Sequence, residues 1–210
     1  MNEILIYSDI GENWMGDGIT AMSIKSQVEG VTGDLTIRIN SGGGDVFDGF
    51  AIYNILNQYE GKKTVYVDGL AASAASVIAM AGDEIIMADN ALLMIHDPWT
   101  LALGSADEMR NTADLLDKIK WSIVTTYRTK TGIDDAELSQ MMSNETWLNA
   151  EESILKGFAT STAESQKKVA NLEKPWIKNA PKPETIENED IETLTAWRLA
   201  ANRRKLSLIE

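Results

Sequence analysis

The sequence predicts an α/β domain in which helices are layered on a mainly parallel sheet. Windows of strand-like and helix-like apolar periodicity alternate along the chain as far as Ala163. Two glycine-containing segments of small residues, 40–45 and 69–76, each lie between an expected strand and an expected helix. Strand–helix alternation is typical of parallel sheets, because each helix returns the chain to the edge where the next strand starts.

Short runs of apolar and β-branched residues predict five strands. In the clearest run, Leu35, Ile37 and Ile39 alternate with polar residues, which is typical of a strand with one buried face. The expected strands cover residues 4–7, 35–39, 64–67, 84–87 and 92–95.

Apolar residues at helical spacing predict six helices between and after these strands. In the first, Ile19 and Met22 belong to the apolar spacing. The longest begins at Ser105, which forms a capping-box pattern with Glu108, and Gly157 suits the position just beyond the last. The expected helices cover residues 18–28, 46–56, 74–81, 105–127, 135–142 and 150–156.

The composition changes after Ala163, so we expect a domain over 1–163 and an extension over 164–210. Three of the four prolines lie in this extension, at Pro175, Pro181 and Pro183, among Lys, Asn and Glu residues. Such a composition predicts an extended or disordered linker. One short helix is expected at 191–200, with Ile191, Leu194 and Trp197 on one side.

Charge and composition exclude several classes of function. With 32 acidic and 19 basic residues, the chain has a formal net charge of −13 and would repel nucleic acid and anionic membranes. The absence of cysteine excludes disulfides and a Cys nucleophile, and a single histidine leaves no His-cluster metal site. Neither a signal peptide nor an apolar run of about 20 residues is present, so we expect a cytoplasmic protein.

The segment 40–45, Asn-Ser-Gly-Gly-Gly-Asp, lies at the expected carboxyl end of a strand. Three consecutive glycines allow unusual backbone angles and let another chain approach closely, and their N–H groups would face an anion or an oxyanion. A phosphate-binding loop is disfavoured because Asp45 and Val46 replace its Lys-Ser/Thr ending. A plain tight turn remains the alternative.

Ser73 and His96 are the residues that predict nucleophilic chemistry. Ser73 lies among small residues at an expected strand-to-helix junction, which would leave its hydroxyl accessible. The N–H groups at the start of the helix would stabilise negative charge that develops there. The alternative is that Ser73 is only the N-cap of the helix. A serine nucleophile needs a base, which here is His96 unless a lysine serves. His96 ends an apolar strand, where a parallel sheet usually presents its site, although a lone histidine is often structural.

Three segments resemble those of the ClpP family of serine peptidases. Residues 40–44 are similar to the family's Asn-Ser-Pro-Gly-Gly turn, with Gly42 replacing the proline. Residues 69–73, Gly-Leu-Ala-Ala-Ser, resemble its nucleophile segment, and residues 94–98, Met-Ile-His-Asp-Pro, resemble its Met-Ile-His-Gln-Pro segment around the base. Their order and spacing match, and the resemblance covers residues 4–163.

The resemblance implies a ClpP/crotonase-like fold with a long protruding helix, and it implies roles for five residues. Ser73 would be the nucleophile, His96 the general base and Glu145 the acid that orients the imidazole. The N–H groups of Gly43 and Ala74 would form the oxyanion hole. This chemistry needs no cofactor.

Glu145 is assigned by position relative to the family pattern. Counted from Thr131-Gly132 to the stretch that contains Trp147, the family's aspartate falls on Glu145. Asn144 and Asp97 compete for the role, although Asp97 adjoins His96 and would point to the opposite face of an extended chain.

The sequence departs from the family pattern in several features, and in these features it resembles the head-maturation proteases of tailed phages and prophages. The chain starts almost at its first strand, the residues after the base (99–104) lack the family's glycines, and an extension follows the domain. We therefore expect an ATP-independent endopeptidase that processes capsid or scaffold proteins in the host cytoplasm or inside the prohead. Family membership also implies self-association into a ring, a heptamer or tetradecamer.

Other functions remain open. One is a general ClpP-like peptidase that works with an unfoldase, and another is an inactive ring or scaffold component. A crotonase-type enzyme would share the fold, and a Ser/Lys peptidase would take its base from one of four lysines: Lys62, Lys63, Lys118 or Lys120.

Overall fold

The computed structural model describes residues 2–12 and 18–163, all within one compact unit, Met1–Val169. The expected extension over 164–210, including the short helix at 191–200, lies outside the described residues. The domain boundary at 163 therefore stays a prediction.

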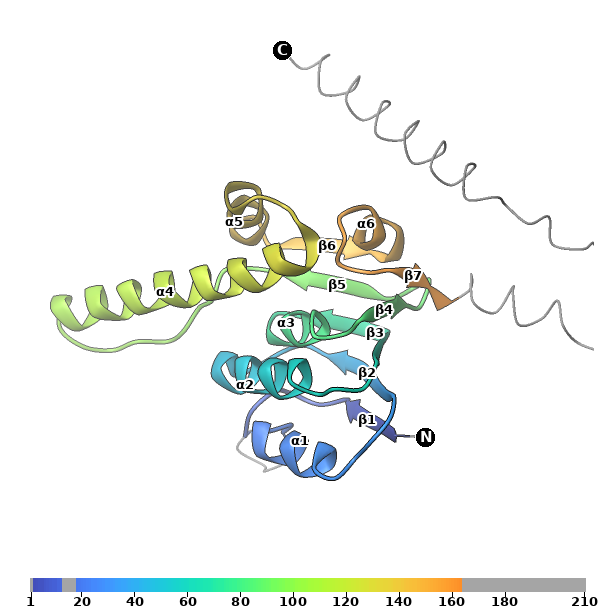
Figure 1. Ribbon diagram of the computed structural model, residues 1–210. Coiled ribbons are helices and arrows are strands. Elements are labelled where there is room, and N and C mark those ends of the chain that lie inside the picture. Colours follow the sequence, from blue (N-terminus) through green and yellow to red (C-terminus); the bar gives the residue numbers. More distant parts are fainter. Residues whose placement is uncertain (1, 13–17, 164–210) are drawn as a thin grey trace, which may run out of the picture. The chain divides into compact units, whose positions relative to one another are not determined.

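A seven-stranded sheet forms the centre of the described unit (Figure 1). Five strands run in the order β1-β2-β3-β4-β7, β5 pairs with β3, and β6 pairs with β5. Every pairing is parallel except the antiparallel pairing of β5 with β6. The strands are β1 (Asn2–Ile6), β2 (Leu35–Ser41), β3 (Lys63–Ala72), β4 (Glu84–Met87), β5 (Leu92–Ile95), β6 (Thr146–Asn149) and β7 (Ser161–Thr162). The mainly parallel α/β fold is confirmed, whereas β6 and β7 were not expected.

All six expected helices are present, with somewhat different bounds. Helices α1 (Ala21–Val28), α2 (Val46–Asn57) and α3 (Ala74–Ala79) lie along one face of the sheet, and α4 (Ala106–Thr131) projects from it (Figure 1). Helices α5 (Asp135–Ser143) and α6 (Ala150–Leu155) flank β6 in the chain. The capping box of Ser105 and Glu108 is confirmed, and Gly157 follows α6 with a φ of 79°.

Two of the apolar residues assigned to the first helix, Ile19 and Met22, do not lie on its buried face. Thr20 caps this helix, so Ile19 precedes it and pairs with Ile10 instead. Met22 points to solvent, with 70% of its surface exposed. Ile24 is the fully buried residue of the helix.

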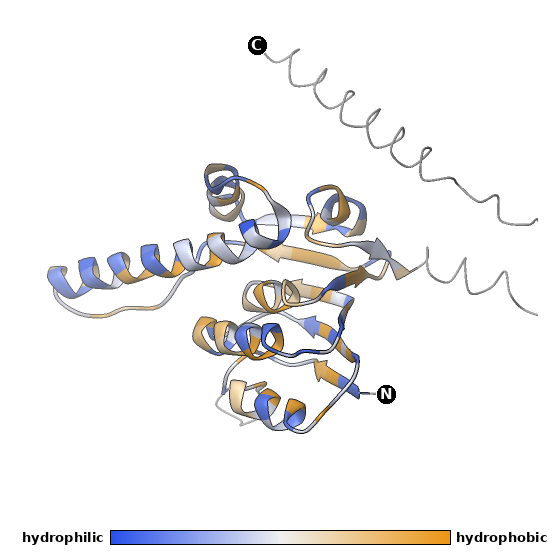
Figure 2. Ribbon diagram, in the orientation of Figure 1, coloured by the Kyte–Doolittle hydropathy of each residue, from blue (hydrophilic) through white to orange (hydrophobic). Residues whose placement is uncertain are grey.

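The core lies between the sheet and the helices on its face. Alternate residues of β1, β2 and β3 are buried, which matches strands with one face against helices. Figure 2 shows hydrophobic residues concentrated in these strands and in α2 and α3, whereas the projecting half of α4 is mixed. The sheet therefore supplies a rigid base from whose strand ends the site is built.

Strand β3 changes partners along its length, and this change positions the site. Its first half pairs with β4 as far as Val67, and its last three residues, beginning at Leu70, pair with β5. A register irregularity against β2 occurs at the same level, between Ile39 and Ser41. Because Ala72 pairs with Met94, the chain leaves β3 directly beside the end of β5.

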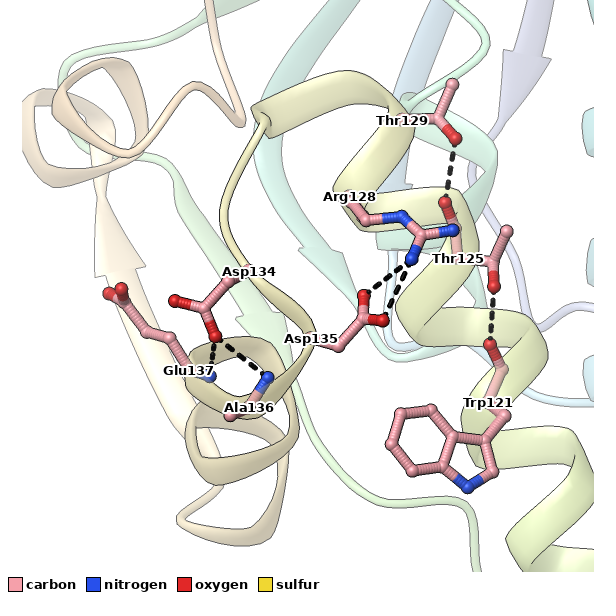
Figure 3. A network of polar contacts seen from close by, with 8 residues as sticks. All are labelled: Trp121, Thr125, Arg128, Thr129, Asp134, Asp135, Ala136 and Glu137. Carbon is pink, nitrogen blue, oxygen red and sulfur yellow. Dashed lines mark hydrogen bonds and ion pairs between the residues drawn. The ribbon is translucent and has the colours of Figure 1, made fainter.

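A polar network fastens α5 to the end of α4 (Figure 3). Arg128 Nη1 donates to both carboxylate oxygens of Asp135, at 3.0 and 2.8 Å. Asp134 caps α5, because its Oδ1 accepts from the N–H groups of Ala136 and Glu137, both at 2.9 Å. Since β6 follows α5 directly, this junction also sets where β6 meets β5.

We expect Asp134→Ala to lower the free energy of unfolding by about 1 kcal/mol, because two helix N–H groups lose their acceptor. Urea unfolding followed by tryptophan fluorescence measures the change. Asp89→Ala is the control: Asp89 is exposed and makes no side-chain hydrogen bond within the described residues, so it should stay within about 0.5 kcal/mol of wild type. Equal stabilities for the two variants would contradict the capping role.

Candidate active site

Ser73 and His96 form a direct hydrogen bond. Ser73 Oγ lies 2.8 Å from His96 Nε2, and both residues are half-buried. Ser73 follows β3 and His96 follows β5, so the pairing of these two strands brings the residues together. The sequence-based expectation that the hydroxyl meets the chain's single imidazole agrees with this geometry.

The backbone of Ser73 adopts a conformation that is rare for a residue with a side chain. Its φ is 54° and its ψ is −126°, which costs about 1–3 kcal/mol and persists only where surrounding contacts hold it. One of these contacts is the bond from Ser73 N–H to the carbonyl oxygen of Met94, at 3.0 Å. The Ser73 hydroxyl makes no capping bond to α3, so the N-cap alternative does not account for it.

Gly43 lies directly against Ser73, and a larger residue would not fit there. Its φ is 95°, and a Cβ at this position would lie 2.7 Å from both Ser73 Cβ and the carbonyl oxygen of Ala72. The Gly43 N–H donates to Ser41 Oγ at 3.1 Å, whereas the Ala74 N–H is the first of α3 and has no acceptor within that helix. Both N–H groups therefore lie beside Ser73, but the one on Gly43 already has a partner.

Glu145 directly precedes β6, and its carboxylate has a partner other than His96. The antiparallel ladder of β5 and β6 ends at the pair Ile95–Thr146, and His96 and Glu145 are the next residues beyond that pair. Glu145 has a φ of 49°, and its Oε1 accepts from Trp147 Nε1 at 3.1 Å. Within the described residues, His96 hydrogen-bonds to Ser73 and not to Glu145.

The two residues that compete with Glu145 are held by other groups. Asp97 forms an ion pair with Lys120 at 2.9 Å and accepts from Ser143 Oγ at 2.9 Å. Asn144 Oδ1 accepts from the side-chain amide of Gln140. Among the described residues neither side chain hydrogen-bonds to the imidazole, whose partner is Ser73.

None of the four lysines considered as alternative bases hydrogen-bonds to Ser73 within the described residues. Three of the four form ion pairs: Lys62 with Glu84, Lys63 with Asp83, and Lys120 with Asp97. Within the described part of the chain, Ser73 Oγ contacts His96 and no lysine. This arrangement favours a Ser/His pair over a Ser/Lys pair.

A cavity of about 590 Å³ opens over the Ser73–His96 pair. The glycine segment 42–44 forms one wall, and apolar side chains from α3, β5 and α4 form another. These apolar residues include Val77, Met94, Ile119, Ile123 and Tyr127. A cavity of this size with one apolar wall can take an extended peptide segment and bury one of its side chains beside the hydroxyl.

Two residues near the nucleophile were missed as part of the site. The sequence analysis placed Ser76 in the expected helix 74–81 and Tyr127 at the end of the expected helix 105–127, and it gave neither residue a role in the site. Ser76 hydrogen-bonds both to the Ser73 carbonyl oxygen and to the Tyr127 hydroxyl. The spacing of three residues between Ser73 and Ser76, at the start of a helix, is a pattern that could have indicated the first contact.

The described residues contain neither a membrane-spanning helix nor a metal site. None of their helices is both long and apolar enough to cross a bilayer. No group of three or more His, Cys, Asp or Glu residues among them is arranged to hold a metal ion.

Known proteins share both the sequence pattern and the fold. The proteolytic subunit 2 of the ATP-dependent Clp protease from Treponema denticola is 27% identical over 169 residues, covering 80% of this chain and 84% of the relative. The Clp proteolytic subunit from Leuconostoc citreum is 28% identical over 159 residues, covering 74% and 79%.

The solved structure of a mutant ClpP1 from Listeria monocytogenes has the same fold. Its TM-score is 0.67 at 24% identity, and the match covers 77% of this chain and 90% of that one. A family model described as Clp protease matches residues 2–166. The chain therefore belongs to the Clp protease family of serine peptidases.

Proposed function

We propose that the chain is a serine endopeptidase in which Ser73 attacks the scissile carbonyl and His96 is the general base. The observation that carries this proposal is the 2.8 Å hydrogen bond between the two side chains at the base of a peptide-sized cavity. Family membership supports the same reaction class. An inactive scaffold role would not need this bond, nor the strained backbone at Ser73.

The reaction follows from these positions. Ser73 Oγ bonds to the carbonyl carbon while His96 Nε2 takes the hydroxyl proton, which gives a tetrahedral oxyanion. His96 then donates that proton to the leaving amine, and the peptide bond breaks to leave an ester on Ser73. Water, deprotonated by His96, hydrolyses the ester and restores the hydroxyl.

The oxyanion would be bound by the N–H groups of Gly43 and Ala74. The Ala74 N–H has no acceptor within α3, and Gly43 packs against the Ser73 side chain. Gly43 would exchange the Ser41 hydroxyl for the oxyanion, a charged and therefore stronger acceptor.

Glu145 would complete the triad by a rotation of its side chain. Glu145 and His96 both lie just beyond the last pair of the β5–β6 ladder, which supports this role, and the carboxylate would leave the Trp147 indole and turn towards the imidazole. Glutamate can then orient the base and stabilise the imidazolium, as aspartate does in most triads.

We expect Ser73→Ala and His96→Ala each to lower peptide hydrolysis at least about 1,000-fold, because both groups act as one unit. Hydrolysis of a fluorogenic peptide and labelling with a fluorophosphonate probe measure the loss. Ser122→Ala alters an exposed serine of α4, so this variant should hydrolyse the peptide and be labelled by the probe as the wild-type protein is. Full activity of the His96 variant would instead favour a lysine base.

Gly43→Ala should lower the turnover number at least about 100-fold, because its new Cβ would displace the nucleophile and the adjacent N–H group. Gly42→Ala is the matched control, since a Cβ on Gly42 meets no atom within 4 Å. Steady-state kinetics of the two variants should differ in turnover number. Equal activities would contradict the placement of Gly43 in the oxyanion hole.

Glu145→Gln should lower the turnover number at least about 100-fold, since a neutral amide cannot stabilise the imidazolium. Trp147→Phe keeps an aromatic ring but removes the indole donor, so it should keep full activity or raise it up to about five-fold. The same peptide assay reports both changes. Wild-type activity in the Glu145 variant would remove this residue from the triad.

For the biological role, we propose ATP-independent processing of phage capsid or scaffold proteins, in the host cytoplasm or inside a prohead. Two features support a specialised member of the family: glutamate in place of the aspartate, and the segment 99–104 in place of the family's glycines. In that segment Leu101 and Leu103 are 91% and 100% exposed, which supports assembly with further copies into a ring, a heptamer or tetradecamer.

The alternative role is that of a general Clp proteolytic subunit that works with an ATP-driven unfoldase. The names of the relatives, which are subunits of ATP-dependent Clp proteases, favour it. Co-expression with phage capsid and scaffold proteins separates the two roles, with Ser73→Ala as the control. Serine-dependent trimming of a structural protein without an added ATPase supports head maturation, and degradation of folded proteins only with an unfoldase supports the alternative.

A further inference from the structure

Two buried hydroxyl groups lie directly behind the nucleophile. Ser76 is fully buried in α3, and Tyr127 of α4 is 1% exposed. Ser76 Oγ lies 2.6 Å from the Ser73 carbonyl oxygen and 2.8 Å from the Tyr127 hydroxyl oxygen. The three groups therefore form a continuous chain of hydrogen bonds from α4 to the backbone of Ser73.

The direction of this chain follows from the acceptor at its end. A carbonyl oxygen only accepts, so the Ser76 hydroxyl must donate its proton to Ser73. Ser76 Oγ is then free only to accept from its other neighbour, so Tyr127 donates to Ser76. Burial raises the pKa of the Tyr127 hydroxyl above its ordinary value, so Tyr127 keeps its proton and stays a donor at neutral pH.

This series of hydrogen bonds ends on the Ser73 carbonyl oxygen, so it holds the backbone of the residue that carries the nucleophile. The same oxygen also accepts the N–H of Ser76 at 3.0 Å, and on the other side of the residue the Ser73 N–H is bound to Met94. Because the φ of Ser73 is positive, the residue would relax to a common conformation if these contacts weakened. Such a relaxation would carry Oγ away from His96.

We propose that Ser76 and Tyr127 are positioning residues, which hold Ser73 in its strained conformation with Oγ against His96. This inference rests on the function proposed above. Tyr127 is itself held in place, because its ring packs edge-on against Phe158 with the ring centres 5.4 Å apart. Neither hydroxyl contacts the reacting atoms, so both act through the backbone of Ser73.

The test compares Ser76→Ala, Tyr127→Phe and the double variant. All three are assayed below the unfolding temperature of the least stable variant. Tyr127→Phe preserves the ring contact, and the double variant removes both hydroxyls, so neither of the two is left without its partner. Two substitutions elsewhere are matched controls. Ser153→Ala alters another buried helical serine, and Tyr59→Phe removes a bond from a tyrosine hydroxyl to the Gly33 carbonyl.

We expect Ser76→Ala to slow fluorophosphonate labelling of Ser73 about ten-fold, and to lower the turnover number on a peptide equally, with KM within about two-fold. Tyr127→Phe should slow labelling several-fold, and the double variant should resemble Ser76→Ala because the two hydroxyls act in series. In every variant labelling should still reach completion. The controls should label at the wild-type rate.

The outcomes separate this inference from the function on which it rests. Labelling of Ser76→Ala at the wild-type rate, while Ser73→Ala is not labelled, would overturn the positioning role and leave the peptidase intact. A lower end point at an unchanged rate would also overturn it, because that result reports loss of folded protein. Labelling that persists in Ser73→Ala would overturn the proposed function itself.

Discussion

The hydrogen bond between Ser73 and His96 depends on one feature of the sheet, the change of partner along β3. Because β3 leaves β4 after Val67 and pairs with β5 from Leu70, the two chain segments that follow these strands emerge side by side. A β3 that stayed beside β4 would place the hydroxyl away from the imidazole. The sheet topology therefore sets the chemistry, and the local contacts of Ser73 refine it.

The glycine segment and the nucleophile constrain each other. Gly43 is close enough to Ser73 to exclude a side chain, and the positive φ of Ser73 turns its hydroxyl towards β5. Both features cost conformational stability, about 1–3 kcal/mol for the strained serine alone. A well-packed core of β-branched and leucine side chains between the sheet and α1–α3 offsets this cost. The strain is thus located where the proposed reaction takes place.

Periodicity predicted the parallel sheet and the six helices because these are long or strongly patterned, as in the alternation of Leu35, Ile37 and Ile39. Strand β7 was missed because it is only two residues long. Strand β6 was missed because Trp147 and Leu148 are its only apolar residues, whereas β4 and β5, which are equally short, are almost entirely apolar. The contact between the Ser73 hydroxyl and the His96 imidazole was predictable from three motifs and a single histidine. The bond from Ser76 to Tyr127 was not predictable, because side-chain partners 51 residues apart leave no local pattern. The contact between Glu145 and Trp147 is local, but the sequence does not show which of several nearby groups the carboxylate binds.

The central claim is that the Ser73 hydroxyl and the His96 imidazole act together on a polypeptide. A peptide chloromethyl ketone tests both groups at once, since the serine adds to its carbonyl while the imidazole displaces chloride. Peptide mapping by mass spectrometry should find the wild-type protein alkylated on His96, and should find that Ser73→Ala loses this reaction. Alkylation at another residue, or alkylation of His96 that is indifferent to Ser73, would contradict the account.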